Sequence, residues 1–138
     1  DRWVQLKPNP DSPCIFTKGL AVHGVLPMPV RHGEGKLVAR DAVTLQRLQD
    51  ENLIALQYTH PETGEATQEH PWNPNGSPLA IAGLTDPTGH ILGLMPHPEA
   101  FHHATNHPGW TRGEVAVPGT ALFANAVRYL RENPVNHS

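Results

Sequence analysis

A histidine and a glutamate two positions apart form the part of this sequence best suited to chemistry. His97 and Glu99 lie in the segment Met95–Glu99, where a proline precedes each of them. A residue before proline is pushed into an extended conformation, and alternate residues of an extended chain project to the same side. The two side chains are therefore expected to lie within reach of each other. A carboxylate that binds one imidazole nitrogen leaves the other free as a base, so the segment predicts the base and orienting group of a nucleophilic triad.

Two other segments contain residues that suit ligand binding. The segment His32–Gly35 reads His-Gly-Glu-Gly, and its glycines permit positive φ and a close approach of the backbone to a ligand. The segment Trp72–Ser77 reads Trp-Asn-Pro-Asn-Gly-Ser, in which asparagine and glycine favour tight turns. Either motif alone is equally typical of a plain surface turn, so neither identifies a ligand by itself.

Short strands are expected to position these motifs. Apolar or alternating runs predict strands or extended segments at 3–6, 25–30, 36–39, 53–58, 79–84 and 91–95. Pro27 and Pro29 cannot donate to a sheet ladder, so their segment belongs at a sheet edge or leads into a site. The turn signal Asp86–Gly89 joins the last two runs as a hairpin or as adjacent strands.

Two helices accompany the strands. They are predicted at 41–52 and 120–132. Asp41 is suited to cap the first, and Leu122, Ala126 and Leu130 recur every four residues along the second. This mixture indicates the α/β class, but two helices are too few to cover both faces of a parallel sheet. The missing cover is expected from sequence absent from this chain.

Composition excludes several classes of protein. The chain has 138 residues and a net charge of −3, without the basic excess of a nucleic-acid binder. No apolar run reaches the roughly 18 residues of a membrane span. A single cysteine excludes an internal disulfide and a multi-cysteine zinc site, and favours a cytoplasmic setting. The chain begins at Asp1 with no signal peptide, which indicates a processed product or a piece of a longer protein.

Taken together and in order, the motifs resemble one enzyme family. The sequence runs HGEG, then NPNGS, then IAGLTDPTGHILGLMPHPE. This set resembles the glutaminase subunit or domain of phosphoribosylformylglycinamidine synthase, a class I (triad) glutamine amidotransferase of purine biosynthesis. The resemblance extends from about Trp3 to Asn133 and is most specific between Trp72 and Glu99.

The resemblance implies a mechanism and a set of roles. A cysteine attacks the side-chain amide of glutamine, ammonia leaves, and water hydrolyses the resulting thioester to glutamate. The ammonia passes to a synthetase subunit or domain, which uses ATP and Mg²⁺ to convert formylglycinamide ribonucleotide to the amidine. His97 would be the catalytic base, and Glu99 would orient it; no cofactor or metal is expected in this chain. The residues implied in shaping the glutamine pocket and synthetase contact are His32, Gly33, Asn75 and Ser77.

The family's nucleophile has no counterpart here. In the family it belongs to a glycine-rich strand-turn-helix elbow, whereas Cys14 follows a proline within an apolar run. Cys14 is therefore interpreted as a buried structural residue. Residues 1–138 are expected to form the C-terminal part of an amidotransferase domain, with a partial flavodoxin-like fold that lacks the N-terminal half of the sheet. Without its nucleophile, the isolated chain is expected to have no glutaminase activity.

Three alternatives remain open at this stage. The first is a metal-binding module, because four histidines cluster near Glu99, although their spacing matches no standard motif; they are His97, His102, His103 and His107. The second is a non-catalytic interaction fragment, since half a domain would expose apolar surface. The third is a complete hydrolase, which requires Cys14 within hydrogen-bond reach of His97.

Overall fold

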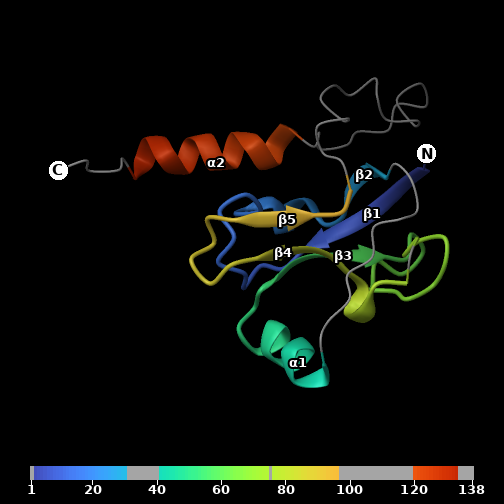
Figure 1. Cartoon of the computed structure of the whole chain (residues 1–138). Coiled ribbons are helices and arrows are strands. Elements are labelled where there is room, and N and C mark those ends of the chain that lie inside the picture. Colours follow the sequence, from blue (N-terminus) through green and yellow to red (C-terminus); the bar gives the residue numbers. More distant parts are fainter. Residues whose placement is uncertain (1, 31–40, 75, 97–119, 134–138) are drawn as a thin grey trace, which may run out of the picture.

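The computed structural model describes residues 2–30, 41–74, 76–96 and 120–133. Within these ranges the strands form one sheet in the order β2-β1-β3-β4-β5, and every pairing is antiparallel (Figure 1). The strands are β1 (Arg2–Pro8), β2 (Leu26–Val30), β3 (Ile54–Thr59), β4 (Ile81–Thr85) and β5 (Leu92–Leu94). The helices are α1 (Ala42–Asp50) and α2 (Thr120–Glu132), with 3₁₀ turns at Leu20–His23 and Pro78–Ala80.

Most of the predicted elements are confirmed. Helix α2 has the predicted bounds, and α1 begins after Asp41, whose carboxylate accepts a hydrogen bond of 2.8 Å from the Thr44 N–H. That N–H bond and the Thr44 hydroxyl hold the pKa of the Asp41 carboxyl below its usual value. The proline-containing segment is the edge strand β2, and β4 and β5 form the expected hairpin. The segment 36–39, predicted as a strand, lies outside the described residues.

The α/β class is confirmed, but the sheet differs from the one expected. A flavodoxin-like fold implies parallel strands, and none of the pairings between the described strands is parallel. The hairpin explains one of these pairings, because a turn as short as Asp86–Gly89 reverses the chain and makes consecutive strands antiparallel. The apolar run at residues 14–17 is irregular, with a bend at residues 15–17, and contributes no strand.

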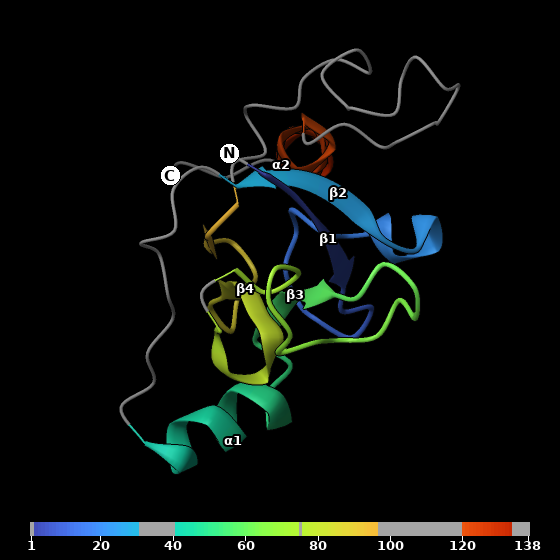
Figure 2. The ribbon, with the colours of Figure 1, turned by 90° about the vertical axis from the view of Figure 1, so that its right-hand side faces the viewer.

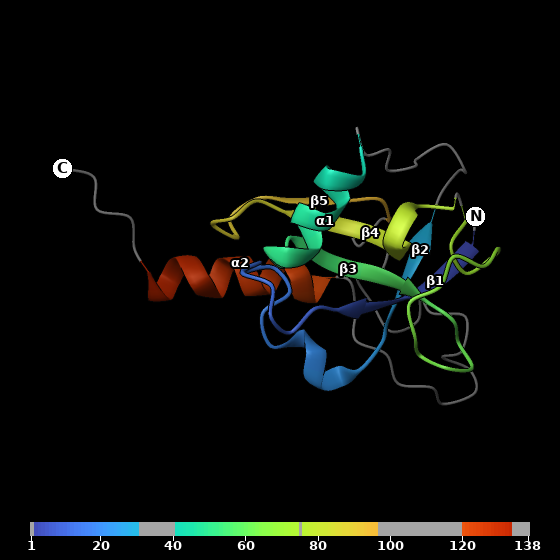
Figure 3. The same ribbon diagram turned by 90° about the horizontal axis from the view of Figure 1, so that it is seen from below.

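The core lies on the inner face of the curled sheet, beneath α2. Its buried members come from four strands and the segments beside them: Val4, Leu6, Leu20, Leu26, Met28, Leu56, Tyr58, Ala80, Ala82 and Leu122. Leu122 is the member from α2, which lies above β1 and β2 when the molecule is seen along the helix (Figure 2). Seen from below, α2 extends well beyond the strands (Figure 3). In the described ranges, neither helix has both the length and the hydropathy needed to cross a bilayer.

The turn between β4 and β5 is held by one carboxylate and one close backbone contact. Asp86 accepts hydrogen bonds from the backbone N–H groups of Thr88 and Ile91, at 3.3 and 3.0 Å. The Thr88 hydroxyl also donates to this carboxylate and is the main cause of the lowered pKa of Asp86. Gly89 has φ +78°, and its carbonyl accepts a 2.9 Å bond from the Ile15 N–H. The turn is thereby tied to the loop that contains Cys14.

Replacing Gly89 with alanine tests the close contact. A Cβ at this position would lie 1.8 Å from the carbonyl oxygen of Pro13, so the loop or the turn must move. The matched control is Gly64→Ala, which has a similar φ of +70° but nothing within 4 Å of the added Cβ. We expect Gly89→Ala to lower the free energy of unfolding by about 1–3 kcal/mol more than the control, as overpacking does. Urea denaturation measures both, and equal losses would contradict the packing described for this turn.

Tyr58 makes the fold sensitive to alkaline pH. Burial raises the pKa of this phenol to about 12, from 10.0. Between these values the unfolded chain loses the proton while the folded chain keeps it, so unfolding becomes easier as pH rises. The stabilisation is complete below pH 10 and declines from there toward pH 12. We expect Tyr58→Phe to flatten this decline in denaturation midpoints measured across the range. Tyr129→Phe should retain the decline, and the same slope in both variants would rule out Tyr58 as its source.

Candidate functional site

Only one of the six predicted site residues falls within the described part of the structure. Ser77 is described, and the other five lie outside it: His32, Gly33, Asn75, His97 and Glu99. What the structure does describe is the chain on either side of two of these motifs. It shows how the segment that leads to His97 is held, and how the loop around Asn75 is built.

The β4–β5 hairpin holds the chain up to the residue before His97. Strand β5 pairs with β4 from Leu92 to Leu94, and the Met95 N–H then donates to the Ala82 carbonyl at 3.0 Å. Pro96 is buried. The pairing therefore continues past the last residue of β5, and His97 follows directly on a point of the chain that is hydrogen-bonded and packed.

Asn73 holds the loop of the Trp72–Ser77 motif together. Its side chain is 1% exposed and makes three hydrogen bonds. The amide nitrogen donates to the carbonyls of Thr67 and Ser77, at 3.1 and 3.0 Å, and the amide oxygen accepts from the Ser77 N–H at 2.9 Å. The same side chain thus fixes both ends of the segment that contains Asn75. The sequence marks this segment as a turn, and the structure identifies Asn73 as the residue that organises it.

Ser77 is buried, and none of the described residues hydrogen-bonds its hydroxyl. The side chain is 1% exposed, and its Oγ has no partner within the described part of the chain. Leu79 and Ala80 follow with φ of 54° and 57°, a left-handed conformation that costs non-glycine residues about 1 kcal/mol or more each. The Leu79 carbonyl accepts a 2.8 Å bond from the Gln57 side chain, which helps to hold this conformation. An unpartnered buried hydroxyl beside strained backbone is an arrangement that occurs at functional sites.

The contacts around His60, in the segment that leads to this loop, were not predicted from the sequence. His60 Nδ1 accepts a bond of 3.1 Å from the Glu62 N–H, and His60 Nε2 lies 3.6 Å from a Glu69 carboxylate oxygen. Its ring meets Trp72 edge to face, with 5.6 Å between centroids. Both ring nitrogens lie near partners in the same segment, so His60 helps to hold the loop together. His60 and its partners lie up to twelve residues apart in an irregular segment, so no periodic sequence pattern predicts their contacts.

Cys14 is buried, in agreement with its interpretation as a structural residue. It is 2% exposed; its N–H donates to the Ser12 hydroxyl at 3.2 Å, and its carbonyl accepts from Thr17 Oγ1 at 3.4 Å. A thiol sealed in this way is closed to a substrate, which argues against the complete-hydrolase alternative. The histidines of the metal alternative lie outside the described residues, and the described ranges contain no group of three His, Cys, Asp or Glu side chains arranged to hold a metal.

Comparison with known proteins identifies the class to which the chain belongs. Residues 1–130 match the CobB/CobQ-like glutamine amidotransferase domain. Because the match covers nearly the whole chain, this protein belongs to that family, and the resemblance inferred from the motifs is confirmed at this level.

The names of several relatives specify one enzyme within this family. The chain is 38% identical to the phosphoribosylformylglycinamidine synthase subunit PurQ of Methanococcus maripaludis (strain C5), over 95% of this chain and 51% of the relative. It is 38% identical to the same subunit of Dehalococcoides mccartyi, over 95% of this chain and 49% of the relative. For Methanothrix thermoacetophila the identity is 39%, over 94% and 50%. The chain therefore spans about half the length of the curated relatives it matches.

Substitutions at Asn73 and Ser77 test how the loop is built. Asn73→Ala removes the side-chain partner of the buried Ser77 N–H and of the Thr67 carbonyl, while the Ser77 carbonyl keeps the Ala80 N–H, and we expect it to lower the free energy of unfolding by about 2–4 kcal/mol. Ser77→Ala is the matched control, because it removes a hydroxyl that has no partner, and we expect a change within about 0.5 kcal/mol or a slight gain. Thermal or urea denaturation measures both. A large loss in Ser77→Ala would mean that its hydroxyl is bonded in the folded chain.

Proposed function

We propose that this chain contributes the base, and not the nucleophile, of a glutamine amidotransferase that supplies ammonia for phosphoribosylformylglycinamidine synthesis. One observation carries the proposal: in a chain of this family, the β4–β5 hairpin holds the backbone through Met95 and Pro96, directly before His97 and Glu99. The names of the PurQ relatives support the choice of reaction.

The chemistry required of these two residues follows from their types. His97 takes the proton from a cysteine thiol as the sulfur attacks the side-chain amide carbon of glutamine. It then gives that proton to the departing nitrogen, which leaves as ammonia, and the glutamyl thioester remains. His97 next removes a proton from the water that attacks the thioester, and returns it to the sulfur as glutamate leaves. Glu99 accepts a hydrogen bond from the other ring nitrogen and stabilises the imidazolium formed in each half-reaction.

The nucleophile in this proposal comes from outside the chain. Cys14 is the single cysteine, and its thiol is buried in a loop. The relatives are about twice as long as the matched part, which leaves ample sequence for a cysteine elbow and its oxyanion donors. We therefore propose that residues 1–138 form the C-terminal part of the domain, and that the parallel strands of a flavodoxin-like sheet belong to the other part.

The remaining predicted residues are assigned to the substrate side of the site. His32 and Gly33 are proposed to shape the glutamine pocket, together with Asn75, whose loop is fixed by Asn73. Ser77 is nearly inaccessible, so its proposed part is to shape the loop beside the glutamine pocket rather than to contact glutamine directly.

The proposed partner is a synthetase subunit or domain that receives the ammonia. ATP and Mg²⁺ are assigned to that partner, where formylglycinamide ribonucleotide becomes the amidine, and no cofactor is assigned to this chain. A cytoplasmic setting belongs to the same proposal, and nucleic acid and membrane have no part in it.

Glutaminase assays test the proposal directly. The chain alone should release no ammonia from glutamine, and addition of the part of a PurQ relative that it does not match should create activity. In that assembled enzyme we expect His97→Asn to lower kcat on the order of 10⁴-fold, the scale at which loss of one triad member acts. Glu99→Gln should also lower kcat and shift its pH profile, because the imidazolium loses its carboxylate partner.

The matched control is His102→Asn, another histidine of the same segment, which should keep its activity. Loss of activity in His102→Asn, together with bound zinc in metal analysis, would favour the metal-binding alternative instead. Ammonia release by the chain alone that disappears in Cys14→Ser would overturn the assignment of the nucleophile. An assembled pair that stays inactive would favour the interaction-fragment alternative.

A further inference from the structure

The two end strands of the described sheet present different edges. Strand β2 pairs with β1 in a register that places Pro27 opposite Gln5 and Pro29 opposite Trp3. Since proline has no N–H, the donors that bond to β1 must come from the alternate residues, and the prolines occupy the positions that face away. The outer edge of β2 therefore lacks the donors that another strand would need. Prolines placed in this way protect an edge from pairing.

The outer edge of β5 is still able to pair. The Asp86 N–H bonds to the Ile91 carbonyl and the Met95 N–H bonds to the Ala82 carbonyl, which fixes the alternation along the hairpin. In this register the backbone groups of Leu92 and Leu94 point away from β4. Gly93 is exposed, and nothing lies within 4 Å of the position of a Cβ there. Strand β5 thus offers a short ladder of donors and acceptors that are not bonded to any of the described strands.

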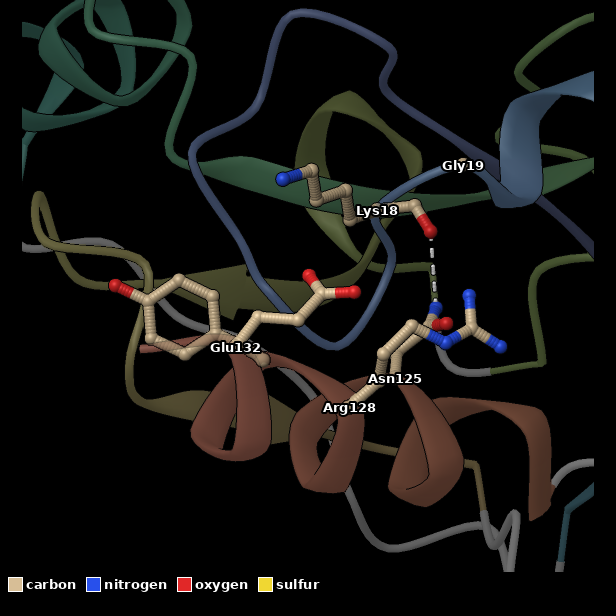
Figure 4. Close-up of a pocket in the computed structure, with 6 residues that line it drawn as sticks. Lys18, Gly19, Asn125, Arg128 and Glu132 are labelled. Atoms are coloured by element: carbon tan, nitrogen blue, oxygen red, sulfur yellow. Dashed lines mark hydrogen bonds between the residues drawn. The ribbon is translucent and has the colours of Figure 1, made fainter. Parts of the chain in front are cut away.

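Helix α2 carries an apolar face that the described part of the chain leaves uncovered. The inward side of the helix is fixed: Leu122 is buried in the core, and the Asn125 side chain donates to the Phe16 carbonyl at 2.9 Å. The same side chain donates to the Lys18 carbonyl at 3.0 Å (Figure 4). Large apolar side chains on the outward side are about half exposed; they are Phe123 at 47%, Val127 at 48% and Leu130 at 55%. Their spacing of four and three residues puts them on one stripe.

The free edge and the apolar stripe belong to one surface. His90, in the β4–β5 turn, hydrogen-bonds the Tyr129 hydroxyl at 3.2 Å, and the two rings lie 5.4 Å apart. A groove of about 470 Å³ runs beside this contact and is lined by Ile15, Phe16, His90, Ala126, Tyr129, Leu130 and Asn133. Ile91, at 67% exposure, adds a further apolar side chain at the start of β5. The surface therefore continues from the turn directly before β5 across the groove to α2.

We propose that the other half of the amidotransferase docks on this surface, with one strand paired to β5 and an apolar face covering the stripe Phe123, Val127 and Leu130. The inference rests on the proposed function, and three observations select this occupant. About half of each relative has no counterpart in this chain, while the matched half accounts for nearly all of it. The surface combines a pairing edge with an apolar stripe, which are the two features that a neighbouring layer of the same domain covers.

The third observation is the position of His97. It follows Leu94 by three residues, which at full extension span about 10 Å. A strand docked on β5 lies about 5 Å from it, and is therefore within about 15 Å of the proposed base. A strand docked on β2 would not lie next to the segment that leads to His97. The prolines of β2 also remove the backbone donors that such a strand would need. The strand proposed to pair with the other half of the amidotransferase, β5, is thus also the strand that leads to His97.

Co-expression tests the surface. The full chain is produced with the part of the Methanococcus maripaludis strain C5 relative that it does not match, and complex formation is measured by co-purification and titration. Val127→Asp should weaken the complex at least tenfold, because the complex would bury a charge in place of two methyl groups.

The matched control places the same charge elsewhere on the same helix. Ala124 is exposed, and its position in the helical repeat puts it beside Arg128, on the flank outside the stripe. Ala124→Asp should therefore leave the affinity unchanged. Failure of the unmodified chain to form a complex, or equal effects of the two substitutions, would overturn the proposal.

Amide hydrogen exchange tests the edge separately. The Gly93 and Met95 amides face β4 and should be protected with or without the partner, whereas those of Leu92 and Leu94 should become protected only in the complex. Unchanged exchange at Leu92 and Leu94 in a formed complex would show that β5 is not the docking edge. Their protection in the chain alone, rising with concentration, would identify a second copy as the occupant. A complex with the expected protection but no glutaminase activity would uphold the surface and reject the proposed function.

Discussion

The register of the β4–β5 hairpin is the constraint on which the site depends. The Asp86 carboxylate closes the turn, Gly89 lies against the Pro13 carbonyl, and the Met95 N–H completes the pairing. A slip of one residue would exchange the two faces of β5 and direct every later side chain to the opposite side. The chemistry proposed for His97 therefore begins in contacts of the preceding turn, made by groups that take no part in it.

Local signals were sufficient to predict the helices and the hairpin. Asp41 predicts the start of α1 because its carboxylate satisfies a backbone N–H that the first turn leaves open. The four-residue repeat through Leu122 predicts α2, and Asp86–Gly89 predicts the turn. In each case the interaction joins residues close in sequence. The edge position of β2 is predicted as well, because the missing N–H of proline is a property of the residue itself.

The contacts that organise the candidate site join residues that are far apart or irregularly spaced, and these were beyond prediction. Gly89 meets Pro13 across more than seventy positions, and no composition or periodicity encodes that approach. The sequence placed Asn73 in a turn motif. Its buried hydrogen bonds, however, depend on how the folded loop positions the carbonyls of Thr67 and Ser77. The antiparallel order of the sheet likewise depends on long-range pairing between β1 and β3. The roles of His97 and Glu99 were predicted from their types and their spacing of two residues, and the family resemblance supplied the reaction they would serve.

The proposed division of the domain allows a folded half with an incomplete site, because the core and the proposed docking surface use different faces of the same elements. The core side of the sheet is closed by Leu6, Leu56 and Leu122, so the described part has an interior of its own. The outward stripe of α2 and the free edge of β5 add little to that interior, and exposing a few half-buried side chains costs a folded chain only modestly. These groups gain most of their stabilisation when another layer covers them. Assembly of the fold and assembly of the triad would then be one event, since the strand that completes the sheet arrives beside the residue that needs a thiol.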